Sequence, residues 1–368
     1  MKKTKLIHFF EDLTDPRRKS GNMRHELLDI VVISICGVIC GAESWEEIEE
    51  YGKMKEPWFS SFLSLPNGIP THDTFNRVLS SLSPIEFEEC FSNWVKSLVV
   101  ATGHEVIAVD GKTICGAKVN GKSPIHMVSA WACENNLVLG QVKVNEKSNE
   151  ITAIPTLIEA LAVQGCVVTI DAMGCQTDIA DKIIERKADY VLAVKGNQGT
   201  LIEEIQDEFR FGKAIETFVD EDYGHGRIET RVCSVIHADD FKHITQKEKW
   251  KNMSAIVRIE SSREFKKTGE MEKATRYYIS STSQPASEMQ DIIRHHWGVE
   301  NKLHWTLDVC FREDFNRKRH KNAAQNFSLI NKIVLNLLKH EKSCKLGMKS
   351  KRKIAGWSEA YLLKILNF

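Results

Sequence analysis

The chain has 368 residues, a length that allows two or three domains and a full hydrophobic core. Its hydrophobic fraction of 42% and charged fraction of 27% are those of an ordinary soluble globular protein. Lys plus Arg and Asp plus Glu number 50 each, so the net charge neither favours nor excludes a polyanionic partner. Any nucleic-acid surface must therefore come from local clustering of charge.

The cysteines and the N-terminus indicate the cellular compartment. The 10 cysteines are scattered and no Cys-x-x-Cys pair occurs, so free thiols in a reducing cytosol are expected instead of a zinc ribbon or a disulfide framework. The basic start, Met1–Lys5, is not followed by a long apolar core, so no signal peptide is predicted. The most apolar run, 27–42, carries Asp29 and is too short to span a bilayer. We expect a cytoplasmic protein with a buried helix there and no membrane partner.

Residues 1–100 are expected to form an all-helical N-terminal domain. Ser44 and Glu47 have the spacing of a capping box, and Thr71 is placed to cap a helix with apolar residues at helical spacing. The segment 83–98 begins with a cap, a first-turn proline and a capping-box Glu. Such a domain would serve DNA binding or assembly, and the pattern does not separate these two roles.

The pattern changes after residue 101. The order of elements in 101–211 is strand, strand, strand, helix, strand, helix, strand, helix. The strands are expected at 106–109, 127–133, 137–144, 166–171 and 190–194, and the helices at 154–161, 179–184 and 201–209. Three consecutive strands predict an antiparallel meander within a mixed sheet that carries packed helices. The order is typical of an RNase H-like α/β core, of which 101–211 is the first part.

The remainder divides into two segments. Residues 212–285 are expected to be a strand-rich insertion, because 228–236, 254–260 and 276–281 alternate apolar and polar side chains. Residues 286–368 are expected to complete the core with a long helix from 287 to 307, followed by C-terminal helices and a basic cluster at 345–353.

Two aspartates end separate buried strands and are the first candidates for chemistry. Asp110 is followed by Gly111, and Asp-Gly is also the commonest hairpin-turn dipeptide, so taken alone a turn is the favoured interpretation. Asp171 changes the balance, because the first and fourth strands of the expected core lie side by side and would bring the two carboxylates together. Like charges at close range repel unless a cation lies between them, and oxygen ligands select Mg²⁺ or Mn²⁺.

The third carboxylate is expected from a helix packed across the sheet. Glu300 is the best candidate, because it shares a helix stripe with Trp297, Leu303 and Leu307. A helix-interior Glu is more often a solvated residue. Three such carboxylates would hold two cations for in-line displacement at a phosphate.

Several charged residues near these positions have less certain roles. Glu313 and Asp314 resemble helix-end surface charges, and a surface position is favoured for Lys112. Lys195, at a strand end, is a candidate phosphate contact. His225 and Arg227, in an expected loop of the insertion, suit contacts to a DNA backbone.

The motifs together resemble one known family. They are His296-Trp297-x-x-Glu300-Asn301-x-Leu303-His304-Trp305-x-Leu307-Asp308-Val309-x-Phe311-x-Glu313-Asp314, Ala108-Val109-Asp110-Gly111-Lys112, Thr169-Ile170-Asp171-Ala172-Met173-x-x-Gln176, Lys195-Gly196-Asn197-Gln198, His225-Gly226-Arg227-x-Glu229-x-Arg231, Ser44-Trp45-Glu46-Glu47-Ile48 and His72-Asp73-Thr74-Phe75-x-Arg77. In this order they resemble the DDE transposases of the H-repeat, Rhs-associated insertion-sequence family. The resemblance covers nearly the whole chain.

The resemblance implies a DNA transposase that cleaves and transfers strands at the inverted-repeat ends of its element, with Mg²⁺ or Mn²⁺ as cofactor. It implies Asp110, Asp171 and Glu300 as the catalytic and metal-binding triad, with separations of 61 and 129 residues. It further implies a homodimer acting on element ends and target DNA. Arg294 and Trp297 are plausible DNA contacts.

The chain departs from the tyrosine–arginine–glutamate–lysine signature of the wider superfamily. Ile293, His296 and Leu307 occupy the flanking places of that signature. Hairpin formation and end processing are therefore left open, whereas the triad is not affected.

Three other functions were weighed. A catalytically silent DNA-binding relic is suggested by the basic segments 17–19 and 345–353, although such clusters are usually solvated surface. A nuclease without strand transfer is the second alternative. A metal-free hydrolase using His295, His296 and His304 is the weakest, because no nucleophile elbow and no His-Glu-x-x-His motif occurs.

Overall fold

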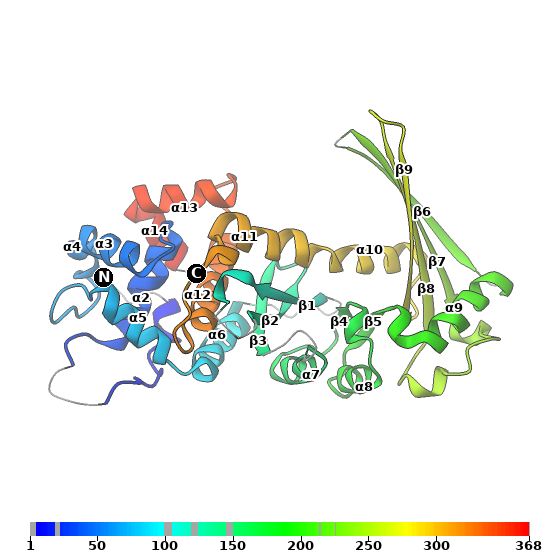
Figure 1. The fold of residues 1–368 in the computed structure, drawn as a ribbon, viewed down its shortest axis with the longest axis horizontal. Coiled ribbons are helices and arrows are strands. Elements are labelled where there is room, and N and C mark those ends of the chain that lie inside the picture. The colour runs from blue at the N-terminus through cyan, green and yellow to red at the C-terminus, as the bar shows by residue number, and fades with distance from the viewer. Residues whose placement is uncertain are drawn as a thin grey trace.

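One mixed sheet runs through most of the length of the protein and organises the helices around it (Figure 1). The structure is a computed structural model that describes residues 5–18, 23–98, 105–118, 124–144, 150–212, 215–224 and 226–367. Within these residues the sheet has nine strands in the order β3-β2-β1-β4-β5-β9-β8-β7-β6. The first five are β1 Val106–Ile114, β2 Ile125–Ala132, β3 Leu137–Val144, β4 Val167–Ile170 and β5 Asp189–Val194.

The pairing of these five strands agrees with the predicted meander. Strands β1, β2 and β3 pair antiparallel, whereas β4 is parallel to β1 and β5 is parallel to β4. The expected adjacency of the first and fourth strands is therefore confirmed. The turn interpretation of Asp110-Gly111 is wrong, because β1 continues to Ile114 and Gly111 pairs with Val128 in the middle of the ladder.

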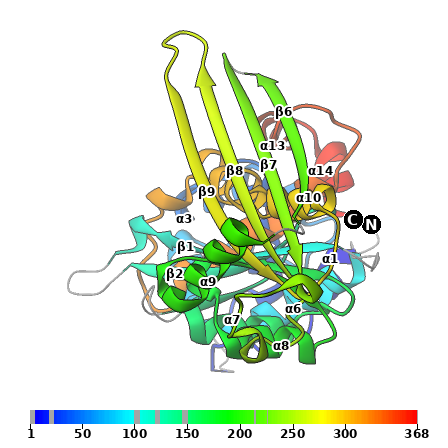
Figure 2. The same ribbon diagram turned by 90° about the vertical axis from the view of Figure 1, so that its right-hand side faces the viewer.

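Helices cover both faces of this part of the sheet (Figures 1 and 2). Helices α7 Glu150–Ala160 and α8 Thr177–Glu185 lie on one face, and α10 Ala286–His296 crosses the other face over β1 and β4. Helix α9 Gly199–Phe211 follows β5. All three helices expected in the first part of the core are present, each with an apolar side toward the strands.

The segment expected to be an insertion prolongs the same sheet. Strand β9 Met271–Ser280 pairs antiparallel with β5, and β8 Ala255–Phe265, β7 Arg227–His237 and β6 Glu216–Gly224 follow in order. The far halves of these strands project from the body as two hairpins (Figure 2). Alternation in the sequence indicated three of the four strands. Strand β6 was missed because nearly all of its residues are exposed, so it has no apolar face to produce a pattern.

The long helix expected over 287–307 is interrupted at one functional position. Helix α10 ends at His296, and Val299–His304 form a π-helical turn that leads directly into α11 Trp305–Phe311. π-helical turns are rare and occur often at functional sites. Glu300 lies within this turn.

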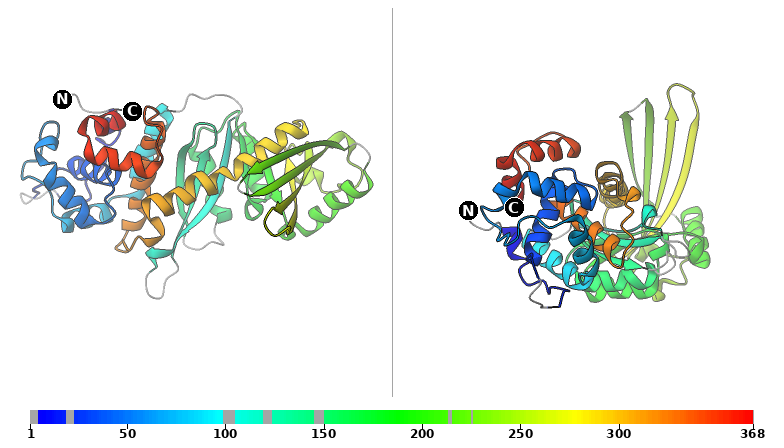
Figure 3. Two further views of the ribbon diagram at one scale, coloured as in Figure 1. Left: turned by 90° about the horizontal axis from the view of Figure 1, so that it is seen from above. Right: turned by 60° about the vertical axis from the view of Figure 1, so that its left-hand side comes forward.

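The N-terminal helices share a hydrophobic core with the C-terminal ones (Figure 3). They are α1 Lys5–His8, α2 Leu27–Ile39, α3 Trp45–Met54, α4 Glu56–Phe59, α5 His72–Ser81 and α6 Pro84–Leu98, and the C-terminal ones are α12 Ala323–His340, α13 Met348–Trp357 and α14 Glu359–Leu366. The buried helix and the Ser44–Glu47 capping box are as expected. Asn326 on α12 donates to the carbonyl of Leu79, 2.7 Å away. In the described part of the chain no helix is both long and apolar enough to cross a membrane.

Candidate functional site

Asp110 and Asp171 occupy neighbouring positions on two parallel strands. Val109 pairs with Ile170 in the β1–β4 ladder. Asp110 and Asp171, which directly follow these two residues, therefore lie at the same level of the sheet. Asp110 lies within β1 with its side chain 19% exposed. Asp171 follows β4, and its Oδ1 accepts backbone N–H groups at 3.1 and 3.4 Å, which fixes the carboxylate at the strand end.

Glu300 belongs to the same electrostatic neighbourhood. Burial, together with the negative charges of Asp171, Glu300 and Glu150, raises the pKa of Asp110 to about 7. A hydrogen bond from the backbone of Gly111 acts in the opposite direction. The exposed carboxylate of Glu300 comes from the helical segment that crosses the sheet above β1. The three residues of the predicted triad thus come from β1, from the end of β4 and from the π-helical turn.

Two histidines attach this helical segment to the strands that carry the aspartates. Nδ1 of His296 is 3.0 Å from Oγ1 of Thr169 on β4, and Nδ1 of His304 is 3.5 Å from Oδ2 of Asp110 on β1. Burial, together with the nearby positive charges of Lys332 and Lys112, lowers the pKa of His304 to about 3. His304 is therefore neutral at physiological pH.

The environment of Lys112 corrects the expectation that this lysine lies on the surface. Its Nζ is 2.7 Å from Oδ1 of Asp308 and 2.9 Å from Oδ1 of Asp314, and its side chain is largely buried. The surface assignment is likewise wrong for Glu313, whereas the side chain of Asp314 is 36% exposed. Glu313 is buried and accepts a hydrogen bond of 2.8 Å from Ser328, and Asp314 binds Lys112. These pairs join segments far apart in the chain, so local spacing gives no sign of them.

A buried pair behind Asp110 was not identified from the sequence. Nε2 of His126 lies 2.5 Å from Oε1 of Glu150, and Nδ1 of His126 lies 2.8 Å from Oγ1 of Thr113. A Cβ at Gly111 would overlap His126 and would lie 2.5 Å from Oε1 of Glu150. No signal in the sequence indicated it, because Glu150 precedes the helix expected at 154–161.

A basic groove of about 380 Å³ lies between the insertion and the long helix. It contains three of the predicted DNA contacts: Arg227, Arg294 and Trp297. Further cationic residues line it, namely Arg231, Arg263, Arg276 and Lys302. We call this surface the arginine groove. Trp297 is 36% exposed, and the guanidinium of Arg276 lies 4.8 Å from its ring centre.

Carboxylates hold several of these arginines in place. Glu229 is buried and contacts Arg227 at 2.7 Å, Arg263 at 3.1 Å and Arg231. Nη1 of Arg294 lies 2.8 Å from Oδ2 of Asp220. One buried carboxylate against three guanidinium groups leaves an excess of positive charge in the groove.

One further predicted DNA contact, Lys195, does not line this groove. Lys195 is exposed at the end of β5, and His225 lies outside the described residues. The residues after Lys195 support the neighbouring loop instead. Asn197 donates to the carbonyl of Ala172 at 2.7 Å and Gln198 donates to the carbonyl of Cys175 at 2.8 Å, so the loop carrying Asp171 is tied to the end of β5.

The donor chemistry of Asp110, Asp171 and Glu300 fits a hard divalent cation. All three supply carboxylate oxygens, and their mutual repulsion is the kind that a bound cation relieves. In their present positions, no three His, Cys, Asp or Glu side chains of the described residues form a group that could hold a metal ion.

Comparisons with known proteins agree along the whole chain. Residues 7–95 match the model of a DDE_Tnp_1-associated region, and residues 101–337 match the model described as a transposase DDE domain. "Putative transposase YncI" of Escherichia coli O157:H7 is 42% identical over 98% of this chain and 94% of its own length. "H repeat-associated putative transposase YhhI" of Escherichia coli K12 is 39% identical over 100% of this chain and 98% of its own length.

One solved structure shows a weak likeness. A piggyBac transposase in a synaptic complex with hairpin DNA superposes with a TM-score of 0.44 at 11% identity, over 96% of this chain and 76% of that chain. This likeness is too slight to support an argument about the fold.

Proposed function

Because the chain belongs to the family of H repeat-associated transposases with a DDE domain, we propose that it cleaves DNA at the ends of an insertion sequence and transfers the strands to a target. The observation that carries the proposal is that Asp110 on β1 is close enough to Asp171, just after β4, and to Glu300, in the π-helical turn, for their charges to raise its pKa. In this proposal the five strands β1–β5 with their helices are an RNase H-like catalytic core, and β6–β9 are an insertion in it.

Asp110, Asp171 and Glu300 would hold Mg²⁺ or Mn²⁺. The bound cations would supply Lewis acid stabilisation of the phosphate and activation of the attacking hydroxyl. The chain itself supplies orientation. Backbone N–H groups fix the carboxylate of Asp171, and His296 and His304 hold the helix of Glu300 against the two strands.

The arginine groove is the proposed path for DNA next to the triad. It shares the long helix with Glu300, and its guanidinium groups suit bidentate contacts to phosphate. Trp297 offers an exposed ring on which a base of a frayed or cleaved end can stack. Lys195, which lies outside the groove, and His225 are proposed as additional backbone contacts.

The proposal extends to the partners and the location of the protein. The DNA partners are the inverted-repeat ends of the element and the target. Two ends must be processed in concert, so a homodimer on DNA in the cytoplasm is proposed.

The test uses an oligonucleotide that carries the terminal repeat flanking the gene, with Mg²⁺, in the wild type and in Asp110→Asn and Glu300→Gln variants. We expect the wild type to nick the DNA and to join a pre-cut end to a plasmid. Both variants should lose activity by at least about 10³-fold, as for groups that act in the transition state, while DNA binding stays within about twofold. Asp207→Asn, an exposed carboxylate on α9, is the matched control and should keep full activity.

Each other outcome has a distinct meaning. Normal nicking by Asp110→Asn would contradict the assignment of the triad. Nicking without joining of a pre-cut end would instead identify a nuclease that lacks strand transfer. DNA binding by the wild type with no cleavage of any substrate would identify a silent relic.

A further inference from the structure

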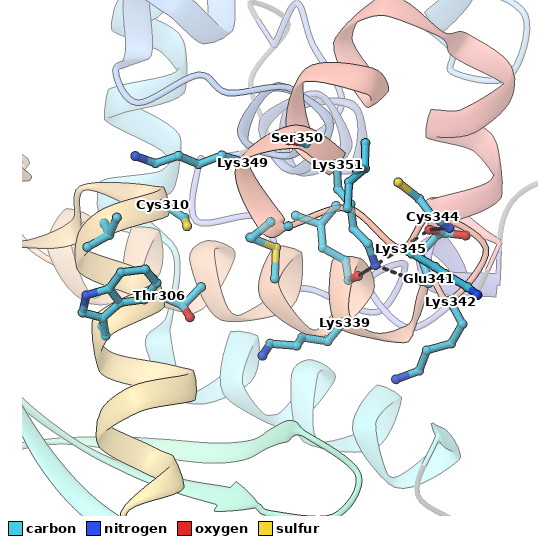
Figure 4. Close-up of a pocket in the computed structure, with 16 residues that line it drawn as sticks. Thr306, Cys310, Lys339, Glu341, Lys342, Cys344, Lys345, Lys349, Ser350 and Lys351 are labelled. Atoms are coloured by element: carbon cyan, nitrogen blue, oxygen red, sulfur yellow. Dashed lines mark hydrogen bonds and ion pairs between the residues drawn. The ribbon is translucent and has the colours of Figure 1, made fainter. Parts of the chain in front are cut away.

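A second groove, of about 780 Å³, lies at the α11 end of the long helix (Figure 4). Its walls are α11, the end of α12, the following loop and the first turn of α13. Five lysines line it: Lys339, Lys342, Lys345, Lys349 and Lys351. We call this surface the lysine groove. It lies outside the triad and outside the arginine groove, and it includes part of the basic segment 345–353.

The single carboxylate among the lining residues is already satisfied within the protein. Glu341 is 1% exposed and accepts hydrogen bonds from the backbone of Ser343 at 2.8 Å and of Cys344 at 3.1 Å. Lys351 turns inward and donates to the carbonyls of Leu338, at 2.9 Å, and of Glu341. Its dashed contacts are drawn in Figure 4. Glu341 therefore shapes the wall and neutralises the inward lysine.

The other four lysines have no carboxylate partner among the described residues. Burial lowers the pKa of Lys339, and the positive charges of Lys302, Lys342 and Lys351 lower it further, which shows that these ammonium groups are close enough to repel one another. Figure 4 shows Lys349 extending from α13 on one side and Lys339 from α12 on the other. An anion bound between these ammonium groups would reduce their repulsion.

The first turn of α13 adds donors to the same wall. Gly347 precedes the helix and provides no side-chain cap, so the first N–H groups of this ten-residue helix lack a side-chain partner. A helix N-terminus favours a phosphate oxygen through these N–H groups and the helix dipole. Gly347, Lys349 and Ser350 all line the groove.

One face of the long helix joins the two grooves. Residues at helical spacing line the arginine groove and then the lysine groove, in the order Gln290, Arg294, Trp297, Asn301, Trp305 and Val309. Trp305 is 59% exposed at the entrance to the lysine groove. The distance along the helix from Gln290 to Val309 is about 28 Å at 1.5 Å per residue. At 3.4 Å per base pair, about eight base pairs of B-form DNA span it.

We propose that the lysine groove is a second phosphate-binding surface, which holds the backbone of the same DNA duplex that lies in the arginine groove. This inference rests on the proposed function, because it assumes that DNA lies along the helix of Glu300. It adds that the duplex is held on both sides of that residue, so that the phosphate to be attacked is placed between two anchors.

The test measures binding of a 30-base-pair duplex at several salt concentrations, without divalent metal and in the Asp110→Asn background, so no catalysis is needed. The variant Lys342→Ala/Lys345→Ala/Lys349→Ala removes three exposed charges from the groove. The control Lys96→Ala/Lys251→Ala/Lys353→Ala removes three exposed charges from outside both grooves. We expect the slope of log K against log salt to fall in magnitude by about three for the groove variant and by less than one for the control.

A hydroxyl-radical footprint on the same duplex locates the lost contacts. The groove variant should lose protection at one end of the footprint only, and at other base pairs than those whose protection Arg263→Ala removes. Equal salt slopes for the groove variant and the control, or a uniform loss of protection, would overturn the inference. If the wild type cleaves DNA but the lysines of this groove contribute nothing to DNA binding, only this inference is refuted. A groove that binds DNA in a protein that never cleaves refutes the proposed function alone.

Discussion

The Nζ of Lys112 lies 2.7 Å from Oδ1 of Asp308, so the strand that carries Asp110 is tied to the helix that follows Glu300. Lys112 is two residues after Asp110, and Asp308 is in α11. The second partner, Asp314, binds the same ammonium group at 2.9 Å. The contact therefore fixes the distance between two elements of the proposed triad without belonging to it.

Replacing Lys112 with Ala should loosen this connection. Two partly buried carboxylates would lose their cation, and we expect a loss of about 1–3 kcal/mol in the free energy of unfolding. Cleavage should also fall, mainly in kcat, because Glu300 would no longer be held against β1. Urea unfolding and cleavage assays measure the two effects. Lys118→Ala, an exposed lysine shortly after β1, is the control, and an equal effect there would contradict the positioning role.

Gly111 should not tolerate even a methyl group. The Cβ of an alanine at this position would overlap His126 and Glu150. Both of those side chains are buried, so they have little room to move aside. Gly111→Ala should therefore destabilise the protein by about 1–3 kcal/mol, as in other overpacked sites, and reduce cleavage by displacing Asp110. Gly199→Ala, where nothing lies within 4 Å of the new Cβ, provides the comparison in thermal unfolding. A Gly111→Ala variant as stable as Gly199→Ala would show that the strand relaxes freely.

We predict that Thr169 acts through the hydrogen bond of its hydroxyl group and not through the volume of its side chain. Thr169→Val keeps the volume but removes the partner of His296 Nδ1, which is 3.0 Å away in a buried position. Leaving a buried polar atom unpaired costs about 1–3 kcal/mol. Thr169→Ser should restore both stability and cleavage. If Val and Ser behaved alike in urea unfolding, the hydrogen bond would have no measurable role.

Low pH should reduce the stability that Glu341 gives to the protein at the lysine groove. Burial alone would raise the pKa of this carboxyl, yet hydrogen bonds from Ser343, Tyr361 and Cys344 hold it at about 2. Because the pKa is lower in the folded state than its usual value of about 4.3, the charged form adds stability above that pH and loses it as the pH falls toward 2.

The measurement is the urea midpoint at several pH values. Glu341→Gln should be less stable than the wild type at pH 7, and the difference should shrink between about pH 4.5 and 2. Glu134→Gln, an exposed carboxylate, should show no such trend. A difference that widens in acid would have the wrong sign for this explanation.

The parts of the fold that were predictable are those in which one segment carries its own pattern. The meander β1–β2–β3 and the helices α7–α9 have apolar residues at the correct spacing, and the adjacency of β1 and β4 follows from their order. Strand β6 has no such pattern because its residues are exposed. The extension of β1 past Gly111 was hidden by a dipeptide that usually marks a turn.

The supports of the candidate site were not predictable, because they depend on contacts across long stretches of chain. Lys112 and Asp314 are 202 residues apart, and Thr169 and His296 are 127 apart. The π-helical turn at Glu300 also has no sequence signature, since its residues suit an ordinary helix equally well.

The shared core of the two ends of the chain has a consequence for synthesis on the ribosome. Helix α2 is buried almost completely, and Arg352 on α13 donates to the carbonyl of Val38 at 2.8 Å. About 280 residues separate the end of α2 from the start of α12, so at 5–20 residues per second α2 waits roughly 15–60 s for its partner. During that time the part of its apolar surface that packs against α12 is exposed, whereas α3 and α5 can already cover other parts. A chain that stops early would never cover that part of α2, and it would be prone to aggregate and be degraded.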